Sequence, residues 1–147
     1  MRLLGIRRKH SERGSSVVEL TLFGPLFFFF FIGALDWGCS AYALITLESA
    51  ARTAALYTSS SGATAGDTSS ACNLVLGEMR ALPNIGSGLN VCTGSPLTVT
   101  ASAVNGPDAA PASKVTVTYT SVPMIPIPGI LSGRFTVSRV VTMRVRG

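Results

Sequence analysis

Residues 13–38 read RGSSVVELTLFGPLFFFFFIGALDWG, and this stretch decides the architecture of the chain. It holds no charged residue at positions 20–35, and five consecutive phenylalanines occupy positions 27–31. As a helix, residues 15–35 would be about 31 Å long, which matches the hydrocarbon thickness of a bilayer. The pattern therefore predicts a membrane-spanning helix that begins near Ser15.

The 147-residue chain has a formal net charge of +5, and that charge is concentrated at its N-terminus. Five Lys or Arg residues against one Glu give the first fourteen residues +4, and the remaining 133 residues carry only +1. Lys and Arg beside an apolar helix stay on the cytoplasmic side of a membrane. We therefore expect a cytoplasmic N-terminus, an exported C-terminal part and contact with membrane lipid. We expect no nucleic-acid partner, because the rest of the sequence has no basic patch with interleaved aromatic residues.

The helical pattern continues beyond the apolar stretch. Pro25 is tolerable inside a membrane helix where neighbouring groups satisfy the freed carbonyl. Asp36 and Trp37 are expected at the membrane interface, with Asp36 either an interface residue or a contact to a partner. Apolar residues then recur at helical spacing, at positions 44, 47, 51 and 54. We predict one helix from about Ser15 to Tyr57, with its second half outside the membrane.

The exported part is predicted to form a small α+β domain. A small-residue linker at 59–71 precedes a short amphipathic helix at 72–82 and a Gly-rich loop at 84–96. Three segments then alternate apolar and polar residues, as half-buried strands do: 97–104, 114–120 and 134–146. The simplest arrangement is a three-stranded antiparallel meander packed on the outer half of the long helix. An apolar loop, MIPIPG at 124–129, either covers this sheet or forms a docking surface for another subunit.

Two of the three cysteines, Cys72 and Cys92, fall in this exported domain. In an oxidising compartment they are expected to form a disulfide, and closing a loop of that length stabilises the fold by about 3 kcal/mol. The alternative is two free thiols in a domain that stays reduced. Cys39, beside the apolar stretch, is either a small apolar filler or a cross-link. The sequence has none of the Cys or His spacings of a zinc site, so we expect no metal and no cofactor.

A candidate cleavage motif lies where the basic leader meets the apolar helix. Gly14 is a small residue at this junction, and Glu19 stands five positions later. A carboxylate at the mouth of a membrane helix is costly and needs a reason. A peptidase that cuts between Gly14 and Ser15 would give Ser15 an α-ammonium group. In a bundle of such helices, this ammonium can pair with Glu19 of a neighbouring subunit and fix the axial register.

Residues 12–58 resemble the TadE-like pseudopilins of tight-adherence (Tad or Flp) pilus systems, a family similar to type IV prepilins. The features that match are Gly14, Glu19, Pro25, Asp36, Gly38 and the run Ala50-Ala51-Arg52. The sequence departs from the family in its Phe-rich run, where Leu is usual, and in the Ser15-Ser16 pair. The resemblance implies a minor pseudopilin that a prepilin peptidase processes and that acts in pilus assembly for adhesion or secretion. The implied partners are that peptidase, other pilins and the Tad membrane machinery.

The expected organisation is a cleaved basic leader at 1–14, a TadE-like transmembrane and stalk helix at 15–58, and a β-rich domain at 59–147. The expected location is the bacterial inner membrane, crossed once, with the C-terminal domain periplasmic or extracellular. Two alternatives for the N-terminus stay open: a plain signal anchor with an accidental Glu19, and signal-peptidase cleavage after Ala41-Tyr42-Ala43.

The alternative function is a membrane-anchored extracytoplasmic binding module that does not polymerise, and an anchored periplasmic enzyme is a third possibility. We expect no enzyme, because the single histidine, His10, lies in the leader. Its position there excludes Ser-His-Asp and Cys-His arrangements from the exported part.

Overall fold

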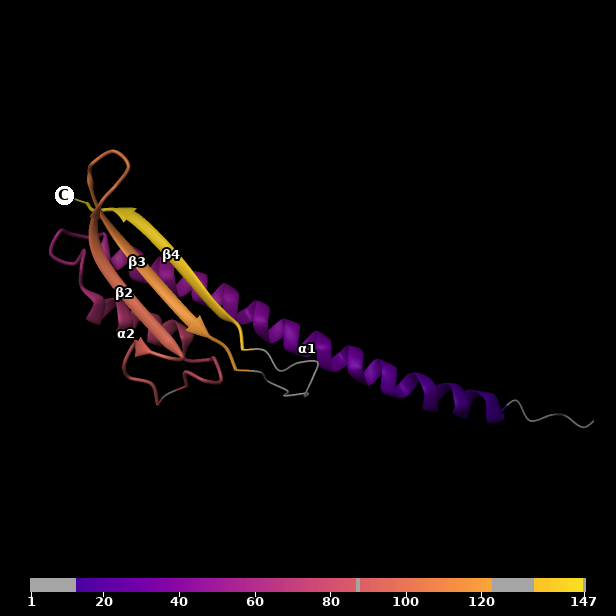
Figure 1. Cartoon of the computed structure of the whole chain (residues 1–147). Coiled ribbons are helices and arrows are strands. Elements are labelled where there is room, and N and C mark those ends of the chain that lie inside the picture. The colour runs from indigo at the N-terminus through magenta and orange to yellow at the C-terminus, as the bar shows by residue number, and fades with distance from the viewer. Residues whose placement is uncertain (1–12, 87, 123–133, 147) are drawn as a thin grey trace, which may run out of the picture. The chain divides into compact units, whose positions relative to one another are not determined.

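The computed structural model describes residues 13–86, 88–122 and 134–146. Two helices precede a four-stranded sheet (Figure 1), so the predicted α+β class is confirmed. The elements are α1 (Arg13–Thr58), α2 (Thr68–Met79), β1 (Thr93–Gly94), β2 (Leu97–Asn105), β3 (Pro111–Thr120) and β4 (Thr136–Arg144). The chain divides into two compact units, one ending at Leu35 and one beginning at Asp36.

Helix α1 is a single element of 46 residues, as the sequence predicts. Its ends lie within two residues of the predicted ones, and Pro25 lies inside it. The sequence-based division at 58/59 follows the end of this helix, whereas the compact units divide at 35/36. The reason is that the part of α1 from Asp36 onward contributes buried residues to the core of the second unit.

Helix α2 begins at Thr68, four residues earlier than predicted, so the linker assigned to 59–71 is wrong in its last part. The cause is a cap that the prediction overlooked. The Asp67 carboxylate accepts hydrogen bonds from the Ser70 backbone N–H (3.0 Å) and from the Ser69 hydroxyl (2.7 Å). These bonds favour the ionised carboxylate and lower the pKa of Asp67 to about 2. At its other end α2 stops at Met79, three residues before the predicted end.

The sheet has the order β1-β2-β3-β4, and all its neighbouring strands are antiparallel. It has four strands rather than the predicted three, because Thr93 and Gly94 pair with Thr98 and Leu97 across a tight turn. The three predicted strands are present with somewhat different ends: β3 starts earlier and β4 is shorter. The MIPIPG loop at 124–129 lies outside the described residues.

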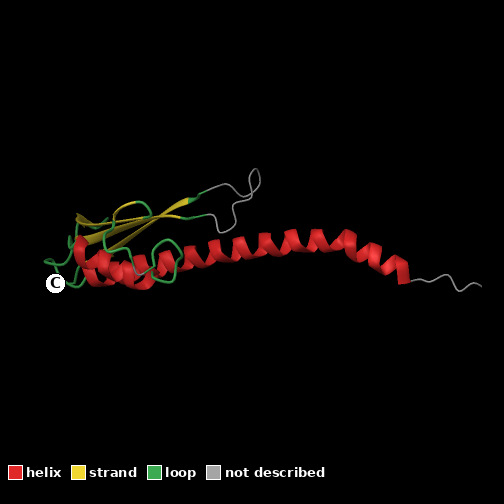
Figure 2. Cartoon of the chain, turned by 90° about the horizontal axis from the view of Figure 1, so that it is seen from below, coloured by secondary structure: helices red, strands yellow, loops and turns green. Residues whose placement is uncertain are grey.

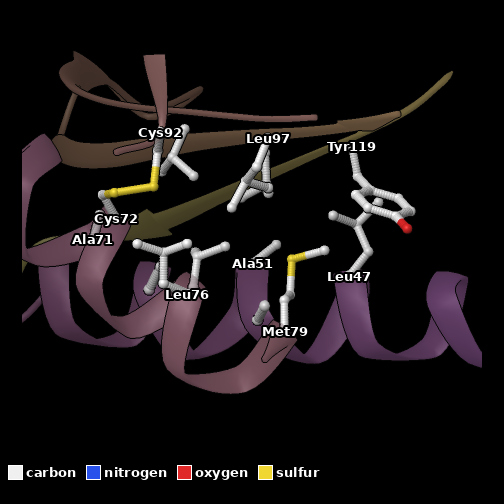
Figure 3. Close-up of a cluster of buried hydrophobic side chains, with 14 of the residues drawn as sticks. Leu47, Ala51, Ala71, Cys72, Leu76, Met79, Cys92, Leu97 and Tyr119 are labelled. Atoms are coloured by element: carbon white, nitrogen blue, oxygen red, sulfur yellow. A yellow bond between two sulfur atoms is a disulfide. The ribbon is translucent and has the colours of Figure 1, made fainter. Parts of the chain in front are cut away.

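The core lies between the sheet and the two helices (Figure 3). In the second unit the sheet forms one layer and the helices form the other (Figure 2). The sheet contributes alternating side chains that are almost completely buried: Leu97, Val99, Val115, Val117 and Tyr119. Residues Leu47, Ala50, Ala51 and Ala54 of α1 and Val75, Leu76 and Met79 of α2 belong to the same cluster. The prediction that the sheet packs on the outer half of the long helix is confirmed.

A buried hydroxyl pair fastens the end of α1 to the sheet. The Ser113 side chain of β3 lies 2.8 Å from the Thr58 hydroxyl and 2.9 Å from the Ala65 carbonyl oxygen. The Arg146 backbone N–H, just after β4, donates to the Ser59 carbonyl at 2.9 Å. Because these contacts join residues distant in sequence, the C-terminal end of α1 is tied to both β3 and the last strand.

Cys72 of α2 and Cys92, just before β1, form the predicted disulfide with a Cα–Cα distance of 5.8 Å. Both cysteines belong to the hydrophobic cluster, so the bridge fastens α2 to the start of the sheet from inside the core. Among the residues that the structure describes, Cys39 is the free cysteine.

Replacing Cys72 and Cys92 together by Ser is expected to lower the free energy of unfolding by about 3 kcal/mol, because the unfolded chain gains the entropy of an open 20-residue loop. Urea unfolding of the full chain in detergent measures the difference. The matched control is Cys39→Ser, which removes a thiol without opening a loop. A double variant as stable as the control would show that the bridge contributes nothing to folding.

Candidate functional site

The first half of α1 presents an apolar surface to its surroundings. Nearly every large side chain from Val17 to Leu35 is exposed, with exposed fractions between 48% and 74%; the positions are Val17, Val18, Leu20, Leu22, Phe23, Leu26, Phe27–Phe31 and Leu35. Water does not sustain an apolar surface of this extent, so lipid or another protein must cover it. Within the described residues α1 is the helix long and apolar enough to cross a membrane, with a mean hydropathy of 2.0 in its most apolar window.

Polar groups in this half are few. The Thr21 hydroxyl donates to the Val17 carbonyl at 2.6 Å, which satisfies the hydroxyl inside the helix itself. Pro25 has no backbone N–H, so the helix lacks one internal hydrogen bond at that point. Glu19 is exposed, and it lies about one helical turn after Ser15 in α1. The predicted cleavage point and the predicted pairing carboxylate therefore share one end of the helix.

A cavity of about 300 Å³ lies in the second unit, beside the first residues of α1 that belong to it. Its walls come from four segments distant in sequence: 36–43 of α1, 81–83 after α2, 119–122 at the end of β3, and Phe135 before β4. Most of the lining is apolar, with Ala43, Leu82, Pro83, Val122 and Phe135 among its residues. Asp36 lines the cavity and is half-buried, whereas its neighbour Trp37 has an exposed fraction of 80%.

Two hydroxyls in the cavity wall, those of Tyr119 and Ser121, are bonded within the protein. The Tyr119 hydroxyl donates to the Asn84 side-chain oxygen at 2.6 Å, and the Asn84 amide nitrogen donates to the Thr120 carbonyl at 2.7 Å. The Ser121 hydroxyl accepts from the Phe135 backbone N–H at 3.1 Å. Burial raises the pKa of Tyr119, and the bond to Asn84 only partly offsets this. The wall is therefore mostly apolar; its other hydroxyls are those of Ser40 and Tyr42, and Asp36 is the charged side chain among the lining residues.

Comparison with known protein families decides what the first segment resembles. Residues 14–56 match the family model described as TadE-like protein. This segment is similar to the TadE-like family. No curated protein and no solved structure matches the chain. The TadE-like segment starts at Gly14 and ends two residues before the end of α1, so the resemblance stated from the sequence is confirmed for this helix.

The TadE-like segment contains most of the residues singled out from the sequence, and the structure places them in three groups along α1. Gly14 and Ser15 lie in the first turn of α1, Pro25 lies mid-segment, and Asp36 and Trp37 lie about three turns later. The roles assigned to these residues in cleavage, subunit pairing and the membrane interface stay predictions. Of the predicted site residues, Cys72 and Cys92 are brought into contact.

The cavity was not predicted from the sequence. Its walls combine one helix, one loop and two strand ends, and nothing in their local sequence marks Leu82, Tyr119 or Phe135 as neighbours. In this region the sequence predicts only the end of a helix at 82 and the start of a loop at 84, and neither indicates a cavity. Within the ranges 13–86, 88–122 and 134–146, no three His, Cys, Asp or Glu side chains gather into a group that would hold a metal ion.

Proposed function

We propose that the protein is a minor pseudopilin that takes part in assembling a Tad/Flp-type pilus after a prepilin peptidase has removed its leader. The observation that carries this proposal is the TadE-like match over residues 14–56. That match begins at Gly14, where the leader is expected to end, and includes Glu19. The other proposed partners are further pilins and the membrane machinery of the Tad system.

The proposed location is the bacterial inner membrane, crossed once by the first half of α1. The basic leader places the N-terminus in the cytoplasm, since Lys and Arg stay on that side. The domain that carries the Cys72–Cys92 disulfide then lies in the periplasm or outside the cell. This orientation agrees with the preference of disulfides for oxidising compartments.

The proposed mechanism is bundling of TadE-like helices. The exposed apolar side chains of α1 lie in lipid before assembly and against neighbouring helices after it. The new ammonium at Ser15 of one subunit pairs with the Glu19 carboxylate of another, and the cost of burying either charge alone fixes the axial register. The proposed role is one of assembly, and the domain proposed to be exported has no histidine with which to form a Ser-His-Asp or Cys-His arrangement.

Protein purified from its native host is expected to begin at Ser15 and to lack the leader. N-terminal sequencing or intact mass measures this directly. A Gly14→Val variant is expected to keep the leader, because a branched side chain hinders close approach of the peptidase to the backbone. Wild-type protein that begins at Met1, or at Leu44 after signal-peptidase cleavage, would contradict the pseudopilin proposal. A retained Met1 would favour the membrane-anchored binding module that does not polymerise.

A further inference from the structure

We propose that the cavity beside residues 36–43 of α1 binds one aliphatic chain of a membrane lipid. This inference goes beyond pilus assembly and rests on the proposed membrane insertion alone, so it applies equally to a protein that never polymerises. Three observations carry it: the chemistry of the cavity wall, its volume, and its place directly after the apolar stretch.

The cavity wall offers an aliphatic chain what it needs and offers a polar ligand little. The hydroxyls of Tyr119 and Ser121 are bonded within the protein. No buried side-chain nitrogen or oxygen among the described residues lacks a hydrogen-bond partner. A peptide or sugar would lose hydrogen bonds to water on entering and find few replacements in a mostly apolar wall, whereas a hydrocarbon chain has none to lose.

The charges at the cavity select the tail of a lipid over its headgroup. Asp36 is the carboxylate in the lining, and no Lys or Arg is among the lining residues. A phosphate would be repelled by Asp36 and would meet no cation in the wall. Asp36 is only half-buried, so its carboxylate keeps contact with water at the rim of the cavity. An uncharged hydrocarbon chain is then neither attracted nor repelled by it.

The volume favours a narrow occupant over a protein helix. A cavity of about 300 Å³ is at the lower end of the range for ligand pockets, which is about 300–1,000 Å³. A single turn of an α-helix, about 10 Å across and 5.4 Å high, already needs more space than this. A hydrocarbon chain is much thinner and can enter such a cavity lengthwise.

The position of the cavity brings it within reach of a lipid. Asp36 follows Leu35, the last residue of the charge-free stretch, without a break in α1. The lining residues of α1, up to Ala43, therefore follow the end of that stretch by no more than eight residues. Trp37, with its exposed fraction of 80%, is the kind of side chain that lies at headgroup level.

Photo-crosslinking with a tail-labelled lipid tests the proposal. The full chain is placed in vesicles of phosphatidylethanolamine and phosphatidylglycerol that contain a phospholipid with a diazirine in its acyl chain. After irradiation, mass spectrometry locates the adducts. We expect adducts in the apolar stretch at 20–35 and also at 81–83, a segment of the cavity wall outside that stretch. Adducts at 81–83 from a tail-borne diazirine mean that the tail has left the bilayer and entered the cavity.

A filled cavity provides the matched comparison. Ala81 is exposed and lines the cavity, so Ala81→Phe adds bulk there with little risk to the core. It is expected to reduce labelling at 82–83 several-fold while labelling at 20–35 stays unchanged. Ala63→Phe makes the same change at an exposed position outside the cavity lining and is expected to label like wild type. Formation of the Cys72–Cys92 bridge checks that each variant has folded.

Each other result overturns the proposal in a distinguishable way. Wild-type protein labelled at 20–35 and not at 81–83 would mean that something other than a lipid tail fills the cavity, either protein or water. Labelling of 81–83 by a headgroup-borne diazirine and not by the tail-borne one would mean surface contact only. Absence of labelling at 20–35 as well would remove the membrane placement on which the inference rests, whereas a failed start at Ser15 alone would leave it standing.

Discussion

Replacing Glu19 by Gln is expected to give a processed, membrane-resident protein that no longer co-purifies with other pilins and supports few pili. Gln nearly preserves the shape of Glu and removes its charge, so insertion should survive, since a neutral side chain is easier to bury. Cleavage between Gly14 and Ser15 should largely survive too, because the cut lies upstream of position 19. Pairing should not survive, because a buried ammonium without its carboxylate costs about 3–5 kcal/mol.

The matched control for this experiment is Glu48→Gln, the same substitution on the same helix. Glu48 forms an exposed ion pair with Arg52, and such pairs contribute little, so assembly should be unaffected. Pilus counts and pilin co-purification in the two strains give the answer. Wild-type assembly in the Glu19→Gln strain would overturn the pairing mechanism even if the mature protein begins at Ser15. A plain signal anchor has no use for the charge and would give that result.

Truncating Leu47 to Ala is expected to destabilise the second unit toward the upper end of the usual range, which is about 2–5 kcal/mol. Leu47 is completely buried and is the largest side chain that α1 contributes to the core. Its buried neighbours on the same helix are alanines, which are too short to reach into the vacated space. Little of the space left by the Leu47 side chain can therefore close, and the loss of stability grows with the void volume that stays open.

Urea unfolding of the full chain in detergent, followed by near-ultraviolet circular dichroism of its tyrosines, measures this loss. The control is Leu56→Ala, the same change two to three turns further along α1 at a side chain with an exposed fraction of 58%. It should shift the transition by no more than about 0.5 kcal/mol, as surface changes do. Equal effects at positions 47 and 56 would contradict the assignment of Leu47 to the core.

The sequence was informative wherever one periodicity ran without interruption. The 3.6-residue pattern of α1 and the two-residue alternation of Val115, Val117 and Tyr119 predict elements that the structure confirms. The misses have local causes. Asp67 starts α2 inside a Ser/Thr-rich stretch that also fits a linker, and β1 is only two residues long, too short for any alternation to appear.

Some features of the candidate site could likewise be predicted from the sequence, and others could not. Gly14, Glu19 and Pro25 could be singled out from the sequence because their spacing along one helix is what marks them. The disulfide could also be predicted, since the part expected to be exported contains two cysteines and so allows one internal pairing. The cavity was not accessible, because its walls are made by the register of the sheet and by where the loop after α2 returns to α1. No pattern within a single segment of the sequence predicts how these walls come together.

The alanine-rich face of α1 has a consequence for the order in which the protein is made. In the proposed orientation, residues 36–58 are exported before the sheet that covers them. They stay uncovered while that sheet is still being synthesised. An uncovered surface of leucine or phenylalanine side chains would bind nonspecifically to other molecules. The face of α1 that the sheet later covers consists of Ala43, Ala50, Ala51, Ala54 and Ala55, with Leu47 as its one large residue. Small side chains expose little apolar area, so this face offers few sites for premature contacts before β2 and β3 cover it.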